Sequence, residues 1–290
     1  MNLRMLAVVA CLSLPNQALP DPEIRTETYE GGAVYTGEFL DGQRHGTGTF
    51  SLPNGYTYEG DWLEGEATGT GRAVFPDGSI YVGTFLEGRP SGEGTLTFPD
   101  GGSYMGDFLD GQMAGEGTAT WSNGTVYVGT FAANQRHGYG VLTASNGYSY
   151  AGDWIDGEKH GRAIIRYEDG AFYCGDIIHE QREGTGAVRT KNGRAWYGSW
   201  HAGEAVRADD ARPLISAFNS YDELQRRTIQ TRLAAHDFYR VAIDGGWGRN
   251  TLVGLICEAV SSGLPPDFET AEEATEFLSD LIDSMSRLNE

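Results

Sequence analysis

Residues 35–50 read "YTGEFLDGQRHGTGTF", and variants of this stretch recur every 23 residues along most of the chain. Each copy begins with an aromatic residue, has Gly two positions later, and has an aromatic residue or Ile two positions after that. The leading residues are Tyr35, Tyr58, Tyr81, Tyr104, Tyr127, Tyr150, Tyr173 and Trp196. Eight copies in unbroken register indicate a repeat protein, in which each unit contacts mainly its neighbours.

Each repeat predicts two short strands and two turns. Asp-Gly or Asn-Gly pairs separate the alternating runs, and such pairs favour hairpin turns because both residues tolerate positive φ. Alternation places Tyr35, Gly37 and Phe39 on one face of a strand and Thr36 and Glu38 on the other. We expect each ring to lie on the bare backbone of nearby glycines. The predicted fold is mainly β, an elongated single-layer hairpin array followed by a small all-α C-terminal domain.

The motif resembles the membrane occupation and recognition nexus (MORN) repeat, which reads Tyr-x-Gly-acid-aromatic and then Gly-x-x-x-Gly-x-Gly. "YTGEFLDGQRHGTGTF", "YVGTFLEGRPSGEGTL" and "YAGDWIDGEKHGRAII" carry the resemblance, and about eight units fill residues 30–205. The departures are Asn134 and Glu180 at the turn Gly, Ala163 at the third Gly and Trp196 at the Tyr. Because they gather late, we expect the last two units to be less regular and to cap the array. MORN arrays in other proteins are associated with protein contacts and with membranes.

The repeats do not predict catalytic or metal chemistry. His45, His137 and His160 share one position, and Glu38 and Asp61 begin a column of acids. Equivalent side chains of successive units lie about 9–10 Å apart, because one unit spans two strands. That spacing is too wide for ligands of one metal ion or for a pair of catalytic carboxylates. We therefore expect no catalytic residue, no metal and no cofactor.

The aromatic face permits a sharper hypothesis. Regularly spaced rings could stack on an extended glycan or hold an apolar partner, or they could only pack on their own sheet. The candidate docking residues are Tyr35, Phe39, Tyr58, Trp62, Tyr81, Phe85, Tyr104 and Phe108. The open edge of such a sheet could also pair with a second copy of the chain, giving a homo-oligomer.

The charge of the chain limits its partners. The net charge is −20, and residues 21–205 hold 12 basic and 26 acidic residues. An acidic surface disfavours nucleic acids and anionic membranes as partners. It suits solubility or a basic partner.

The N-terminus predicts export. Arg4 precedes the apolar run "MLAVVACLSL" (5–14), and residues 1–20 read as a signal-peptide segment, in which the bond after Ala18 is the candidate cleavage point. A lipoprotein signal ending at Cys11 is an alternative reading. The expected location is the periplasm or cell envelope of a bacterium. Cys174 and Cys257 then remain, 83 residues apart in different predicted domains, and nothing in the sequence suggests a disulfide framework or a zinc site.

The C-terminal third predicts helices. Residues 206–219 read as a polar linker and residues 220–290 as a helical domain. "SYDE" (220–223) and "TAEE" (270–273) read as capping boxes. A second helix is expected over 251–260, and the last helix carries an apolar stripe from Ala274 to Leu288.

Residues 229–255 resemble the small helical peptidoglycan-binding-like domain, which reads Gln-x-x-Leu, an aromatic, and then Asp-Gly-x-x-Gly-x-x-Thr. Gln230, Leu233, Tyr239, Asp244, Gly245, Gly248 and Thr251 match, whereas His236-Asp237 replaces the usual Gly. We expect Asp244 to cap the loop and the following helix, with Gly245 and Gly248 at positive φ. The candidate wall-binding residues are Tyr239, Asp244, Trp247, Arg249 and Asn250; a purely structural role is the alternative for the motif.

Together these features predict a non-catalytic envelope protein. The repeat array would be a scaffold for an unidentified protein partner, and the C-terminal module would bind peptidoglycan. The alternatives are a membrane-surface or lipid-associated MORN protein and an accessory subunit of a cell-wall enzyme. No residues in the sequence combine a nucleophile with a base set by a motif.

Overall fold

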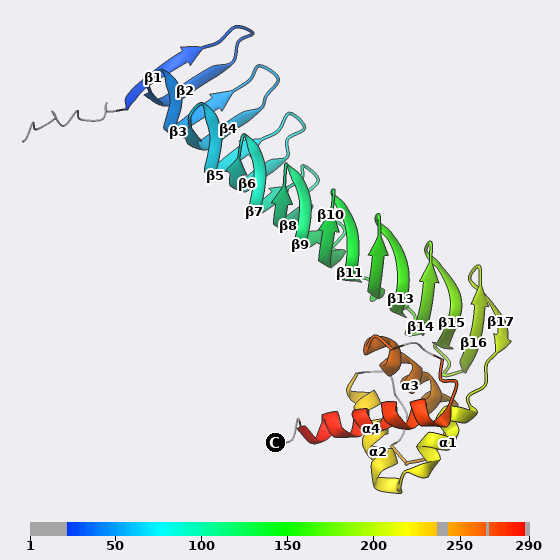
Figure 1. The fold of residues 1–290 in the computed structure, drawn as a ribbon. Coiled ribbons are helices and arrows are strands. Elements are labelled where there is room, and N and C mark those ends of the chain that lie inside the picture. Colours follow the sequence, from blue (N-terminus) through cyan, green and yellow to red (C-terminus); the bar gives the residue numbers. More distant parts are fainter. Residues whose placement is uncertain (1–21, 237–242, 265–266, 288–290) are drawn as a thin grey trace, which may run out of the picture.

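The computed structural model describes residues 22–236, 243–264 and 267–287, and one open antiparallel sheet forms most of it (Figure 1). The predicted export signal and Cys11 lie outside the described residues. The strands are β1 (Glu23–Thr28), β2 (Val34–Leu40), β3 (Gln43–Ser51), β4 (Thr57–Leu63), β5 (Glu66–Val74), β6 (Ile80–Leu86), β7 (Arg89–Thr97), β8 (Ser103–Leu109), β9 (Gln112–Thr120), β10 (Val126–Ala132), β11 (Gln135–Thr143), β12 (Ser149–Ile155), β13 (Glu158–Arg166), β14 (Phe172–Ile178), β15 (Gln181–Arg189), β16 (Ala195–His201) and β17 (Glu204–Ala208).

The strands pair in chain order, so the sheet grows by one hairpin per repeat. β2–β3 is the first repeat hairpin and β16–β17 is the eighth. β1, which the repeat pattern does not predict, pairs with β2 at one edge. This linear order produces the elongated array of Figure 1, and it confirms the predicted fold class.

The two turns of a repeat differ. Asp41 and Gly42 both have positive φ, 50° and 79°, as a two-residue hairpin turn requires. In the second turn only Gly55 does, at 95°. The Oδ1 atom of Asn54 instead accepts a hydrogen bond from the N–H of Tyr56 at 3.0 Å. The expectation of two positive-φ residues is therefore wrong for this turn, where Asn supports the backbone with its side chain.

The turns of the late repeats keep their hairpin shape, and the irregularity expected of the last two units is seen at β17 of the eighth unit. Asn134 and Glu180 adopt the positive φ of the turn Gly, both at 67°, so the hairpin keeps its shape. Their side chains also accept hydrogen bonds from the backbone N–H groups of Met113 and Lys159 in the preceding repeat. Only β17, the last strand, is short.

The C-terminal third forms four helices: α1 (Arg212–Ser220), α2 (Glu223–Ala235), α3 (Arg249–Ser261) and α4 (Ala271–Arg287). β17 and α1 occupy most of the stretch predicted as a linker, because Pro213 suits a helix start and Leu214 and Phe218 are buried. The cap of α2 is Asp222 with Gln225 rather than Ser220 with Glu223. The capping box of Thr270 and Glu273 is confirmed.

Two apolar cores hold the protein together. One runs along the array and contains the repeated aromatic residues. The other lies between the helices and the opposite face of the last strands, where α3 contacts β13, β14, β15 and β16. No helix among the described residues is long and apolar enough to cross a membrane.

Candidate functional site

The tyrosines that begin the repeats close one face of the sheet. The Oη atom of Tyr35 donates to the carbonyl oxygens of Glu38 at 3.0 Å and His45 at 3.4 Å. A Cβ atom added to Gly48 would lie only 2.3–2.5 Å from the ring of Tyr35. The prediction that rings lie on glycine backbone is confirmed. Burial raises the pKa of Tyr35 to about 12, because the phenolate would lose its solvation there.

This packing corrects the expected docking face. Tyr35 contacts Phe39 of its own repeat and Trp62 of the next, with both centroid distances at 5.1 Å and the rings edge to face. Such contacts repeat along the array and leave the candidate rings at most 6% exposed. The residues concerned are Tyr35, Phe39, Tyr58, Trp62, Tyr81, Phe85, Tyr104 and Phe108. Because the rings pack edge to face and are buried, a glycan or an apolar partner has no ring face to stack on.

Aromatic side chains do reach solvent near the turns. Phe98 and Trp121 are 36% and 40% exposed and line a shallow hollow of about 640 Å³ together with Met113.

A pairing of Arg with Trp is a feature that the sequence analysis missed. Arg44, Arg136 and Arg182 lie over Trp62, Trp154 and Trp200, with 4.4, 4.0 and 4.1 Å between the guanidinium carbon and the ring centroid. Each guanidinium also donates to a turn carbonyl of the next repeat. Where the ring is Phe, the Arg position holds Ala67, Pro90 or Met113. The 18-residue spacing between Arg and Trp was the available signal.

The acidic column shapes the strands. The carboxylate of Glu38 accepts hydrogen bonds from the backbone N–H and the hydroxyl of Thr47, at 3.0 and 2.8 Å. These bonds hold a bulge in which Gly46 has a φ of 58°. They also lower the pKa of Glu38, because they favour the charged form. Among the described residues, no group of three or more His, Cys, Asp or Glu side chains could hold a metal ion.

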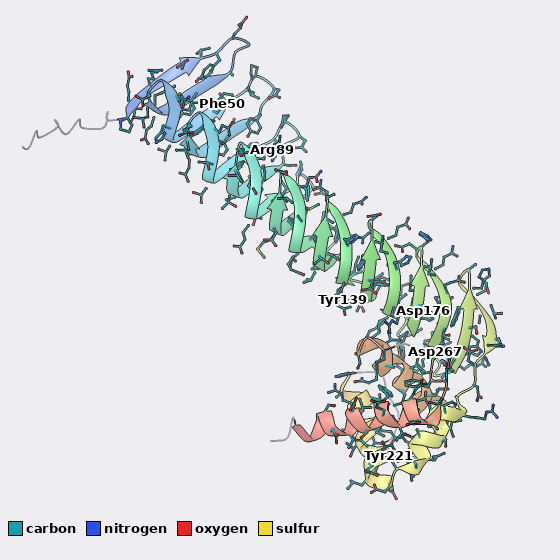
Figure 2. All side chains as sticks on the ribbon, in the orientation of Figure 1. Phe50, Arg89, Tyr139, Asp176, Tyr221 and Asp267 are labelled. Atoms are coloured by element: carbon teal, nitrogen blue, oxygen red, sulfur yellow. A yellow bond between two sulfur atoms is a disulfide. The ribbon has the colours of Figure 1, made fainter. Side chains whose placement is uncertain are left out.

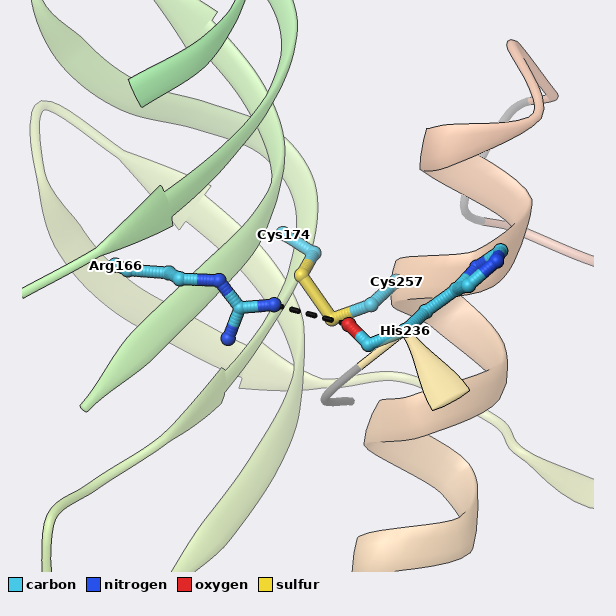
Figure 3. The surroundings of a disulfide bond; sticks show 4 residues. All are labelled: Arg166, Cys174, His236 and Cys257. Carbon is cyan, nitrogen blue, oxygen red and sulfur yellow. Dashed lines mark hydrogen bonds between the residues drawn. A yellow bond between two sulfur atoms is a disulfide. The ribbon is translucent and has the colours of Figure 1, made fainter. Parts of the chain in front are cut away.

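A disulfide joins the array to the helices. Cys174 of β14 and Cys257 of α3 are bonded, and both are fully buried (Figure 3). This corrects the expectation that these cysteines stay apart. Cys174 follows Tyr173 and so points to the opposite face, which is the face that α3 covers. The sequence did contain a clue to this bond, because removal of the predicted export signal leaves an even number of cysteines in an exported chain.

Polar contacts surround this junction. Arg166 of β13 donates to the carbonyl oxygen of His236 at 3.0 Å (Figure 3), and Arg162 donates to that of Gly263 at 2.6 Å. The carboxylate of Glu258, 1% exposed, lies 3.2 Å from Nε of Arg232 and 2.8 Å from Nδ1 of His236. A buried carboxylate needs such partners. The helices are therefore fixed to the sheet by covalent, apolar and polar contacts.

The Gly-rich loop before α3 is held by its own Asp244 and by side chains of α2. The carboxylate of Asp244 accepts from the N–H of Gly246 at 2.8 Å and from the amide of Gln230 at 3.2 Å. The bond from Gly246 lowers the pKa of Asp244. Gly245 has the expected positive φ, 72°. Gly248 does not: its φ is −158°, and it is the N-cap of α3, a position predicted for Asp244.

Of the candidate wall-binding side chains, those of Asp244, Trp247 and Asn250 lie in the described part of the chain. Trp247 is partly buried and packs on Phe218, with 5.4 Å between ring centroids. Asn250 is partly buried, and its Oδ1 atom has no hydrogen-bond partner among the described residues. Tyr239 and the side chain of Arg249 lie outside the described residues.

A family model supports the repeat assignment. The MORN repeat model matches residues 35–55, 58–80, 81–103, 104–126, 127–147 and 150–172. A search of curated proteins found no match. One similar solved structure is the TCP domain of Drosophila melanogaster SAS-4 in complex with a proline-rich motif of Ana2. It is 14% identical to this chain, with a TM-score of 0.34, and the match covers 67% of this chain and 99% of that one. The G-box domain of the microcephaly protein CPAP is also 14% identical with a TM-score of 0.34, and the match covers 62% of this chain and all of that one. The chain therefore contains six MORN repeats between residues 35 and 172.

Proposed function

We propose that the protein is an exported, non-catalytic scaffold of the bacterial cell envelope. Its repeat array docks another protein, and its helical module covers one face of the last strands of the array. The disulfide between Cys174 and Cys257 carries the proposal, because such bonds persist in oxidising compartments and are rare in the cytosol. The bond also explains how the helices stay fixed on the face of the sheet opposite the tyrosines, because it links β14 to α3 covalently.

Fractionation with thiol trapping tests export. The full chain with its own N-terminus is produced in a bacterium, and free thiols are trapped with a maleimide reagent before and after reduction. We expect the chain in the periplasmic or envelope fraction, with Cys174 and Cys257 blocked until reduction. Residues 22–290 alone are the control and should stay cytosolic with both thiols free. Cytosolic retention of the full chain with both thiols free would refute the proposal.

Peptidoglycan binding is a second candidate function. It is supported by the resemblance of residues 229–255 to the wall-binding family and by the exposure of Ile243 and Asp244 at the loop. The full chain should pellet with purified sacculi, and Arg249→Glu should reduce the pelleted fraction. Arg212→Glu, an equal charge change at an exposed site on α1, is the control. Equal pelleting without sacculi, or no difference between the two variants, would contradict wall binding through this loop.

A further inference from the structure

The face of the sheet opposite the tyrosines carries one continuous row of paired residues. From β6 to β11 the row is Val82, Thr95, Met105, Thr118, Val128 and Val141, and each residue is the direct cross-strand partner of the next. We call these six residues the outer stripe. Val82, Met105 and Val128 are 52%, 62% and 52% exposed. The outer stripe is therefore a mainly apolar surface of the sheet, with Val or Met at four of its six positions, and nothing in the described chain covers it.

The same row continues into an interface that is already occupied. Beyond Val141 the paired residues are Ala151, Ile164, Cys174, Ala187 and Tyr197. Cys174, Ala187 and Tyr197 are buried beneath the helices, and α3 contacts every strand from β13 to β16. The protein thus shows what this row accepts, which is an α-helix lying across the strands.

The geometry of α3 explains why a helix fits. One turn of helix rises about 5.4 Å, which is close to the strand spacing of about 4.8 Å. An apolar side chain from each turn can therefore meet one residue of the row. Arg162 of β13 donates to the carbonyl oxygen of Gly263, just beyond the C-terminal end of α3. That end of α3 marks where the covered part of the row stops.

The two flanks of the outer stripe differ in charge. On one side of the stripe, at an offset of two positions along each strand and therefore on the same face, the flanking row contains Glu93, Asp107 and Glu116. Beyond the stripe this row continues to Asp153. Tyr139, the cross-strand partner of Asp153, lies in the same flanking row and is 61% exposed. Figure 2 labels Tyr139 on the array. On the other side the corresponding residues, from Ile80 to Thr143, are uncharged. A helix on the stripe would therefore meet acids along one edge only.

We propose that the outer stripe binds a basic amphipathic helix of a partner protein. The inference rests on the proposed scaffold function and names the partner chemistry. Apolar residues of the helix would cover Val82, Met105 and Val128, and Lys or Arg on one flank would face Glu93 and Glu116. A second copy of this chain is a poor occupant, because two molecules of net charge −20 repel each other.

The ends of the stripe set the length of the helix. α3 and Gly263 close one end, and the charged residues Arg72 and Glu59 continue the row at the other. The six strands between them span about 24 Å. A helix of about 16 residues covers this distance.

A peptide of defined pattern tests the proposal on the full chain. The probe is a fluorescein-labelled 18-residue helix with Leu on one face and Lys on the other, and binding is followed by fluorescence anisotropy at low salt. A peptide of the same composition with Leu distributed around the helix, and one with Glu in place of Lys, are the peptide controls. We expect micromolar binding of the patterned Lys peptide and at least tenfold weaker binding of both controls.

Variants locate the binding. Val128→Lys lies in the outer stripe, whereas Leu109→Lys makes the same charge change at a 63% exposed residue four positions beyond Met105 along β8. We expect Val128→Lys to weaken binding at least tenfold and Leu109→Lys less than threefold, with unchanged melting temperatures. Glu93→Lys with Glu116→Lys should weaken binding and reduce its salt dependence.

Several results would overturn the proposal. One is an equal loss of peptide affinity in Val128→Lys and Leu109→Lys. Another is equal binding of the patterned peptide and its controls. A third is a dissociation constant above about 100 µM for the patterned peptide. Self-association of the chain that Val128→Lys abolishes would assign the stripe to a second copy. Flotation with phosphatidylcholine vesicles that Val128→Lys abolishes would assign it to a membrane. None of these outcomes alters the export and thiol-trapping results, so failure here is distinguishable from failure of the scaffold proposal.

Discussion

Replacing Arg136 and Trp154 singly and together tests whether the Arg–Trp pairs act as units. The guanidinium carbon of Arg136 lies 4.0 Å from the ring centroid of Trp154, and its Nη2 atom donates to the carbonyl oxygen of Gly157 at 2.7 Å. Burial lowers the pKa of Arg136, because the cation loses solvation. The ring and the carbonyl replace part of that lost solvation. Removing either partner should therefore cost more than its own contacts.

The expected sizes follow from these contacts. A partly desolvated cation–π contact contributes about 1–2 kcal/mol, and a hydrogen bond from a charged donor about 1.5–3 kcal/mol. Arg136→Met removes both and should lower the free energy of unfolding by about 3 kcal/mol. Trp154→Phe weakens the cation–π contact, because Phe is a poorer acceptor than Trp, and removes the indole bond to Gly140, at a cost of about 2 kcal/mol. The double variant copies the native Met113–Phe131 pair, so its loss should fall short of the sum by about 1–2 kcal/mol.

Urea unfolding followed by circular dichroism measures this coupling. Variants are compared only where the dependence of the unfolding free energy on urea matches that of the native chain, since repeat arrays can lose cooperativity. Arg136→Met combined with Trp62→Phe, a distant ring, is the control and should be additive to within about 0.5 kcal/mol. A coupling below that value for Arg136 and Trp154 would refute the pairing.

Three further predictions concern the core face, the junction and the tyrosines. Gly83→Ala should lower the free energy of unfolding by about 2–3 kcal/mol, because the added Cβ would lie 2.6 Å from Cα of Gly94. Gly94→Ala should be less destabilising, because Ala163 occupies the equivalent position of a later repeat. Thermal melts of the two variants measure this difference. Replacing Cys174 and Cys257 with Ala removes the bond that closes an 83-residue loop, and should destabilise the helices by up to about 4–5 kcal/mol. An unchanged melting temperature of the helical circular-dichroism signal at 222 nm would contradict this. Burial raises the pKa of four core tyrosines to about 12, above the unfolded value near 10. Their contribution to stability is thus complete below pH 10 and lost as pH rises toward 12, and a melting temperature that stays constant from pH 9 to 11.5 would count against it.

The sequence predicted the repeat fold because each unit repeats the same local constraints. Tyr, Gly and the turn residues recur at fixed positions, so one unit determines all eight hairpins. The predicted lack of a disulfide was wrong because Cys174 and Cys257 lie in different types of structure, and no local pattern brings them together. The helix at 212–220 was missed because its polar start resembles a linker, and only Leu214 and Phe218 show that it packs. The docking aromatics were placed wrongly because the alternation of a strand shows which residues share a face, not whether that face is covered.

The two faces of the sheet therefore carry different information. On the core face, Tyr and Gly are nearly invariant from unit to unit, because the ring–glycine contact is needed in every hairpin to close the sheet. On the opposite face, the residue after each leading aromatic changes along the chain: Thr36, Glu59, Val82, Met105, Val128, Ala151, Cys174 and Tyr197. The fold does not require this variation, since the first seven hairpins have the same strand lengths. The row is polar at its N-terminal end, apolar and open in the middle, and covered by α3 at its C-terminal end. This order divides one regular sheet into segments with different roles. Specific recognition by this protein is accordingly expected where its repeats differ, and the middle segment is the part of that row that remains open to a partner.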